Sequence, residues 1–198
     1  MSRPKNATSN VIGPNAVLQL LPLIERLGGT SRVTKMLKAA GMDEAPDGTE
    51  MIPEVHAARL HQLLRQEEPQ SAPLLAAEAG RATATYILAH RIPQKAQTLL
   101  RLLPARFAAM LLSKAITKHA WTFAGSGQFE RVSPWTYRIK DNPVVRGEVS
   151  QTPLCTWHAA VFEHLYQVLV HPRCRCVETH CCAQHGSEAC VFAIDIAP

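Results

Sequence analysis

The sequence predicts an α+β fold in which N-terminal helices pack on an antiparallel sheet. Apolar residues recur at helical spacing up to His119, whereas Trp, Phe, Val, Tyr and Ile with interspersed Gly and Ser dominate after Ala120. Because the helical segments come first and the strand-like segments follow, an α+β arrangement is favoured over a doubly wound parallel sheet.

Glycine and proline mark the boundaries of the predicted helices. Proline is favoured at the first position of a helix and glycine just past its end. Prolines also recur at positions 69, 73, 93 and 104, so a long Ala/Leu-rich helical run should be broken near the last two. The predicted helices are Gly13-Pro14 to Gly28-Gly29, Thr30 to Gly41, Pro53 to Glu68, and residues 70–119 with breaks near Pro93 and Pro104.

The C-terminal part predicts strands around one further helix. Residues from Trp121 to Glu148 have the composition of an antiparallel meander. Leu154 to Val170 returns to helical spacing and ends at His171-Pro172. Two closing strands are predicted near Cys174 to His180 and Cys190 to Ile196.

The chain has the size of one large domain. With 198 residues, of which 46% are hydrophobic, it can bury a core without disulfides. We separate an N-terminal helical region, residues 1–80, from residues 81–198, and expect the two to form one compact unit. The segment Met1 to Asn10 is polar and no run approaches the ~18 apolar residues that span a bilayer, so we expect a cytoplasmic protein.

Positive charge is concentrated in the middle third. Between Arg81 and Arg146 the chain has eleven Lys or Arg residues and only Glu130 and Asp141 as acids. Such a block attracts anions, among them an acidic protein, lipid headgroups or a ligand with carboxylates, although solvated helix faces have the same composition. We expect no nucleic-acid partner, because neither a recognition-helix pattern nor an aromatic RNA-binding pattern occurs.

Five of the six cysteines lie in the last 25 residues, and Cys155 precedes the C-terminal helix. In a reducing cytosol, clustered thiolates are often metal ligands, most commonly of tetrahedral zinc. The spacing is not that of paired CxxC motifs, so buried inert thiols and redox-sensing thiols remain alternatives. The clustered residues are Cys174, Cys176, Cys181, Cys182 and Cys190.

The C-terminal segment resembles the closing signature of the 4-vinyl reductase domain family. That signature reads Glu-x-x-Cys, a short Gly turn and Cys-x-Phe, which matches Glu178 to Cys181 and Cys190 to Phe192. Ser150 to Cys155 matches the family's other cysteine. The bacteriochlorophyll-biosynthesis members are resembled most by the runs Arg91-Ile92-Pro93, Leu102-Leu103-Pro104 and His119 to Gly127, and the resemblance covers roughly residues 80 to 198.

The resemblance implies a structural zinc ion that clamps the C-terminal helix and strands. Its ligands would be Cys155, Glu178, Cys181 and Cys190, three thiolates and one carboxylate. The family's interval between its last two cysteines fits Cys182 to Cys190 instead, so this chain carries one extra residue, which a bulge would absorb. The sequence leaves open whether Cys181 or Cys182 is the ligand, and it assigns no role to Cys174 and Cys176.

The resemblance also directs attention to a magnesium porphyrin as ligand. Such a flat anionic disc needs aromatic walls, a ligand for its metal and nearby positive charge. We expect a pocket between the helices of residues 81–119 and the strands of residues 121–148. The residues predicted to contact the porphyrin are Trp121, Phe123, Trp135, His90, His119 and Arg91, and His158 is a further candidate among the histidines.

Three functions follow as hypotheses. The first is binding and delivery of a magnesium-tetrapyrrole intermediate beside the magnesium chelatase large subunit and the magnesium-protoporphyrin methyltransferase. The second is a divinyl (proto)chlorophyllide vinyl reductase with an external reductant, because the only Gly-x-Gly, Gly125 to Gly127, lacks the context of a dinucleotide site. The third, a ligand-sensing module, is disfavoured because no output domain is attached. A peripheral membrane contact and a homodimer are also considered.

Overall fold

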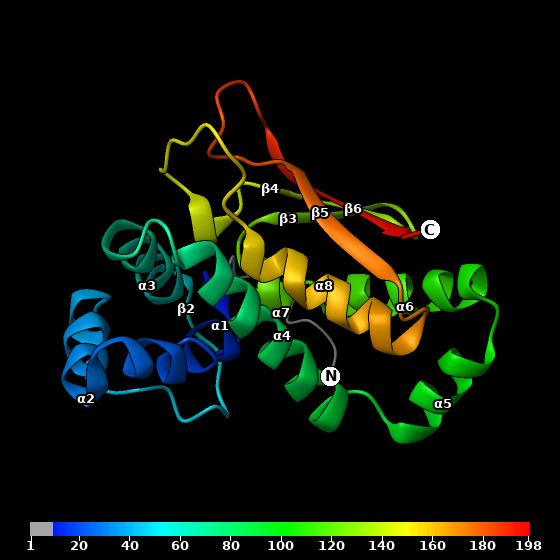
Figure 1. Ribbon diagram of the computed structural model, residues 1–198, viewed down its shortest axis with the longest axis horizontal. Helices are drawn as coiled ribbons and strands as arrows, with labels where there is room; N and C mark the ends of the chain where they lie inside the picture. Colours follow the sequence, from blue (N-terminus) through cyan, green and yellow to red (C-terminus); the bar gives the residue numbers. More distant parts are fainter. Residues whose placement is uncertain (1–9) are drawn as a thin grey trace.

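The computed structural model describes residues 10–198 and contains a four-stranded antiparallel sheet with strand order β3-β4-β6-β5. Buried and more exposed residues alternate along the strands, which is typical of a sheet with one face on the core. Figure 1 shows the helices gathered on one side of this sheet. The α+β prediction is therefore confirmed. The strands are β3 (Gln128–Ser133), β4 (Thr136–Lys140), β5 (Cys174–His180) and β6 (Ala189–Ile196).

Two helices form the centre of the molecule. Helix α8 (Thr156–Leu169) packs on the sheet, and α4 (Ala72–His90) packs on α8. The two backbones approach most closely at Gly80, where an added Cβ would lie 2.4 Å from the carbonyl oxygen of Trp157. The Trp157 indole Nε1 donates to Thr83 Oγ1 at 3.3 Å. Residue 80 is therefore restricted to glycine by packing.

The N-terminal helices begin and end near the predicted glycine and proline boundaries. Within α2 (Leu21–Ala39) the backbone leaves helical geometry at Gly28 and Gly29, so two helical pieces meet at the predicted boundary. Helix α3 (Glu54–Glu67) begins directly after Pro53, as predicted. The remaining elements of this region are α1 (Asn15–Leu18) and the short antiparallel pair β1 (Val11–Ile12) and β2 (Ile52–Pro53).

Proline breaks the middle helical run at both predicted places. Helix α5 (Gln94–Leu102) follows Pro93, and α6 (Ala105–His119) follows Pro104. A proline here lacks the N–H that a helix interior needs, so each one begins a new helix. Figure 1 shows α5 at the end of the molecule opposite α2. Among the described residues, no helix is both long and apolar enough to cross a membrane.

The predicted meander from Trp121 to Glu148 is wrong in part. Residues Trp121–Ala124 form a short helix, α7, and Pro143–Val145 form a 3-10 helix, η1, which leaves only the β3–β4 hairpin as sheet. Trp121 and Phe123 are therefore helical, not on strands. Aromatic composition favoured strands, but Phe123 reaches the core from a helical turn that Gly125, at φ +57°, ends.

A buried carboxylate joins the N-terminal helices to the rest of the chain. Glu54, at the start of α3 and 4% exposed, accepts hydrogen bonds from the Ser126 backbone N at 2.7 Å and Oγ at 2.6 Å. Arg146 Nη1 also donates to it at 3.0 Å. Farther along α3, Arg65 forms an ion pair with Glu148. These contacts pack residues on both sides of position 80 against each other.

Candidate functional site

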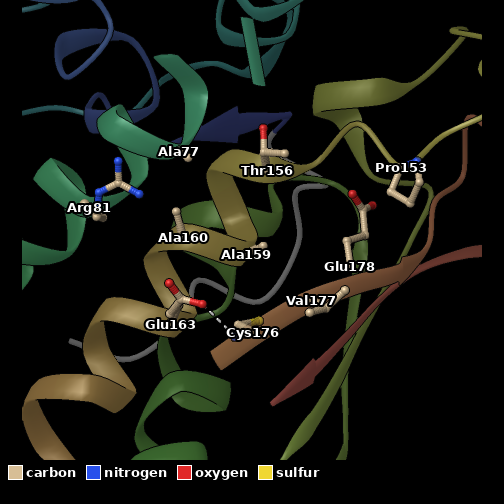
Figure 2. A pocket seen from close by; sticks show the side chains of 10 residues that line it. All are labelled: Ala77, Arg81, Pro153, Thr156, Ala159, Ala160, Glu163, Cys176, Val177 and Glu178. Carbon is tan, nitrogen blue, oxygen red and sulfur yellow. Dashed lines mark hydrogen bonds between the residues drawn. The ribbon is translucent and has the colours of Figure 1, made fainter. Parts of the chain in front are cut away.

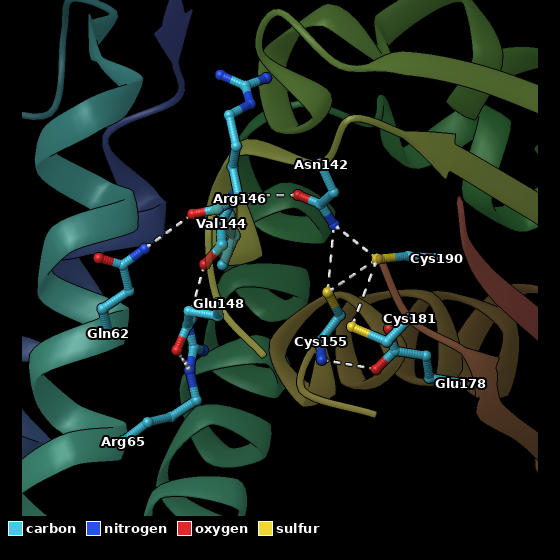
Figure 3. Close-up of polar contacts among 10 residues, drawn as sticks. All are labelled: Gln62, Arg65, Asn142, Val144, Arg146, Glu148, Cys155, Glu178, Cys181 and Cys190. Atoms are coloured by element: carbon cyan, nitrogen blue, oxygen red, sulfur yellow. Dashed lines mark hydrogen bonds and ion pairs between the residues drawn. The ribbon is translucent and has the colours of Figure 1, made fainter. Parts of the chain in front are cut away.

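Four residues predicted as zinc ligands come together in the folded chain. Cys155 directly precedes α8, Glu178 lies on β5, Cys181 follows β5, and Cys190 lies on β6. One ligand atom from each lies within 4.8 Å of the other three, and all four residues are buried. In Figure 3 the three sulfur atoms point toward one another. We call these four residues the thiolate cluster.

The spacing of the thiolate cluster fits a tetrahedral metal site. The Sγ atoms of Cys155 and Cys190 are 3.4 Å apart, and those of Cys190 and Cys181 are 3.8 Å apart. Because Zn–S bonds are about 2.3 Å long, sulfur atoms on a zinc tetrahedron lie about 3.8 Å apart. Glu178 Oε2 accepts from the Cys155 backbone N at 2.6 Å, while its Oε1 is buried without a hydrogen-bond partner among the described residues. That oxygen faces no donor and suits a cation.

A bulge in β5 favours Cys181 over Cys182. Glu178 pairs with Phe192 and His180 pairs with Val191, so β5 carries one residue more than β6 across this step. The extra residue deduced from the cysteine intervals is absorbed here. The Cys182 sulfur is directed instead toward backbone oxygens, 3.6 Å from Ile139 O, while its backbone N donates to Cys190 Sγ at 3.4 Å.

Asn142 is a residue of this site that the sequence did not reveal. Its Nδ2 lies 3.2 Å from Cys155 Sγ and 3.6 Å from Cys190 Sγ, and the residue is fully buried. Its Oδ1 accepts from the backbone N of Val144, which fixes the amide with its donor toward the sulfurs. Donors of this kind stabilise thiolates and orient metal ligands. Asn-Pro in the sequence signalled only a turn.

The charges of the thiolate cluster conflict when only protons are available to it. Burial raises the pKa of Glu178 to about 8, and the nearby charge of Cys181 adds to this shift. Burial also raises the pKa of Cys155, whereas hydrogen bonds from Cys155 and Cys190 lower the pKa of Cys181. One thiolate is thus held among groups that stay protonated. A bound divalent cation would favour the ionised form of all four.

Cys174 and Cys176 lie apart from this cluster. Both are buried on the same face of β5, and Arg175 between them is exposed. Glu163 of α8 accepts from the backbone N of Cys176 at 2.9 Å. Both thiols therefore pack as small core residues.

Two cavities lie near these elements. A cavity of about 300 Å³ is bounded by α4, α8 and β5, and Figure 2 shows Arg81, Glu163 and Glu178 around it. A second cavity of about 390 Å³ lies between Arg65 at the end of α3 and the segment 147–154. None of the six residues predicted to contact a porphyrin lines either cavity.

Four of these six residues are exposed, in two places. His90 and Arg91, at the end of α4, flank Tyr86, with 4.6 Å between the His90 and Tyr86 ring centroids. His119 and Trp121 lie on either side of Ala120, where α6 meets α7, and Trp121 is 48% exposed. Imidazole, guanidinium and indole groups are thus available to a ligand from outside.

Phe123 and Trp135 belong to an aromatic cluster under the sheet. The Phe123 ring centroid lies 5.3 Å from that of Phe129 and 5.6 Å from that of Phe162. Trp135 lies 5.7 Å from Tyr166. His158 is also buried there, with Nε2 3.2 Å from Phe123 O, and burial lowers its pKa to about 4. Packing of α6 and α7 on β3 fills the predicted interface at this point.

Known proteins match this chain over nearly its whole length. The family model of the 4-vinyl reductase domain matches residues 135–196, which include all four residues of the thiolate cluster. A protein named bacteriochlorophyll synthase 23 kDa chain, from Cereibacter sphaeroides, is 50% identical over 190 residues, 95% of this chain and 92% of the relative. A protein of the same name from Rhodobacter capsulatus is 42% identical over 185 residues, 92% of this chain and 86% of the relative.

Solved structures of H-NOX proteins share the fold. An Fe(II) unliganded H-NOX protein mutant from K. algicida superimposes with a TM-score of 0.59 at 14% identity, over 94% of this chain and 97% of that chain. A structure from a study of heme distortion in the H-NOX family gives a TM-score of 0.53 at 12% identity, over 94% and 96%. At this identity the likeness concerns the fold alone.

Proposed function

Because this chain belongs to the family of bacteriochlorophyll synthase 23 kDa chains, which carry a 4-vinyl reductase domain, we propose that it binds and delivers a magnesium-tetrapyrrole intermediate of bacteriochlorophyll biosynthesis. The observation that carries the proposal is the 50% identity with one such chain over 95% of the sequence. The magnesium chelatase large subunit and the magnesium-protoporphyrin methyltransferase are the proposed donor and acceptor.

The fold supports a porphyrin ligand. The H-NOX structures with this fold come from studies of heme and porphyrin distortion, and a magnesium porphyrin has the same flat macrocycle. Apolar and aromatic walls with a few polar groups are what such a ring requires.

The exposed polar residues suggest how the ring would be held. His90 and His119 offer imidazole nitrogen to the magnesium, and Arg91 offers a fork of donors to a propionate. Trp121 lies beside His119 and exposes half of its surface, so it can cover one face of the ring. Phe123 and Trp135 would form the apolar floor.

Titration with a magnesium porphyrin should quench tryptophan fluorescence with an affinity nearer micromolar than picomolar, because ordering costs offset much of the burial. Trp121→Ala and Trp135→Ala, made separately, should each weaken binding by roughly 1–3 kcal/mol if they line the site. Phe107→Ala, which removes another exposed aromatic ring, is the matched control and should bind normally. Normal binding by both tryptophan variants would show that the site lies elsewhere.

The same titration distinguishes delivery from reduction. Divinyl chlorophyllide and NADPH added to the protein should give a shifted absorption spectrum without turnover. Conversion to the monovinyl product, with or without an added reductase, would support the vinyl reductase instead.

We propose zinc as the metal of the thiolate cluster. Three thiolates and one carboxylate in a buried tetrahedral arrangement suit zinc, which would supply structural rather than redox chemistry. Elemental analysis after purification without chelators should give about one zinc per chain. Iron with sulfide, or free thiols without metal, would contradict this assignment.

A further inference from the structure

The middle helices carry positive charge with no acidic residue among them. Between Glu78 and Glu130 the sequence contains seven Lys or Arg residues and no Asp or Glu. This stretch includes most of α4 and all of α5, α6 and α7. In the described part of the chain, the ion pairs involve other basic residues, so these seven charges stay unneutralised.

Large apolar side chains are exposed within the same stretch. Leu102 at the end of α5 is 79% exposed, and Phe107 at the start of α6 is 43% exposed. Leu99 and Leu111, one helical turn away on each side, are exposed as well. Scattered single apolar residues are normal on a surface, but four within thirteen residues form a local group.

Helical spacing places these residues beside cations. Lys95, Leu99 and Leu102 are spaced by four and three residues, so they share one face of α5. On α6, Phe107, Leu111 and Lys114 follow the same spacing, and the opposite face is buried. We call these six residues the α5–α6 surface. Only four residues separate Leu102 from Phe107, so the two faces meet at the corner between the helices.

We propose that the α5–α6 surface docks on an anionic phospholipid bilayer. Apolar tips flanked by Lys and Arg enter the boundary between headgroups and acyl chains, while the anionic headgroups neutralise the cations. A charge of one sign spread over successive helices matches a flat, uniformly charged partner. Figure 1 places α5 and its connection to α6 at one end of the molecule, where a flat partner can approach.

Co-sedimentation with vesicles tests the proposal. The full-length protein should bind vesicles of phosphatidylglycerol and phosphatidylcholine at least tenfold more tightly than vesicles of phosphatidylcholine alone. Binding should weaken as salt rises, because the Debye length falls from about 10 Å at 0.1 M to about 3 Å at 1 M. Equal binding to both kinds of vesicle, or to neither, would overturn the proposal.

Variants locate the contact. Leu102→Glu should weaken binding to the anionic vesicles at least tenfold, and Lys114→Glu should weaken it in the same direction. Leu74→Glu is the matched control, because Leu74 is 73% exposed on α4 outside this surface, and it should bind as the unaltered protein does. If Leu74→Glu and Leu102→Glu weaken binding equally, the contact is not at this surface.

Two further measurements distinguish lipid binding from porphyrin binding and from recognition of an acidic protein. Leu102→Glu should leave fluorescence quenching by a magnesium porphyrin unchanged, so vesicle binding and ligand binding can fail independently. Polyglutamate serves as a probe for an acidic protein partner. If the protein binds polyglutamate but not the anionic vesicles, the surface recognises acidic protein and the proposal of a lipid surface fails.

Discussion

Replacing Cys190 with serine is expected to lower the free energy of unfolding by about 4 kcal/mol, because loss of a structural metal is among the few causes of such large single-residue effects. Cys190 joins β6 to the segments that carry Cys155 and Cys181, and it is fully buried. The whole domain should be destabilised, not one activity alone. Thermal and denaturant unfolding, together with zinc content, provide the measurements.

Cys182→Ser is the matched control for this prediction. Its sulfur lies outside the thiolate cluster, so the variant should keep its zinc, whereas Cys181→Ser should lose it. A chelator should lower the melting temperature of the unaltered protein and leave that of Cys190→Ser unchanged. An unchanged melting curve for Cys190→Ser combined with lost porphyrin binding would mean that Cys190 contacts ligand instead.

Glu54→Ala should destabilise the protein by about 3 kcal/mol, because hydrogen bonds to a charged group contribute roughly 1.5–3 kcal/mol and this carboxylate is buried. The change leaves the Ser126 backbone N–H and hydroxyl without their acceptor. Zinc content should not change, which distinguishes this effect from loss of the metal. Urea unfolding followed by circular dichroism measures it.

Glu67→Ala, on the same helix, is the comparison. Glu67 forms a surface ion pair with Arg32 at 3.2 Å, and such pairs contribute about 1 kcal/mol or less. We expect unfolding to remain a single transition in both variants, because Glu54 connects the two sides of the expected boundary at residue 80. Equal stability of the two variants, or separate transitions for residues 1–80 and 81–198, would contradict this prediction.

The elements were largely predictable because local chemistry determines them. Pro93 and Pro104 lack the N–H that a helix interior needs, and Gly28-Gly29 permits a backbone that other residues avoid, so the boundaries near these residues were predicted correctly. Trp121 to Ala124 was predicted incorrectly. Aromatic residues favour strands on average, but burial of Phe123 from a helical turn outweighs that weak preference.

The sequence alone, through motif resemblance, indicated the four residues of the thiolate cluster and the extra residue between Glu178 and Cys190. The tertiary structure decided which vicinal cysteine faces the cluster, because the choice depends on where the β5 bulge falls relative to β6. It also decided the place of Asn142, whose contacts lie 13 and 48 residues away in the chain. Composition and spacing determine local conformation and residue type, but the direction of a side chain depends on contacts between segments distant in sequence, which only the folded chain brings together.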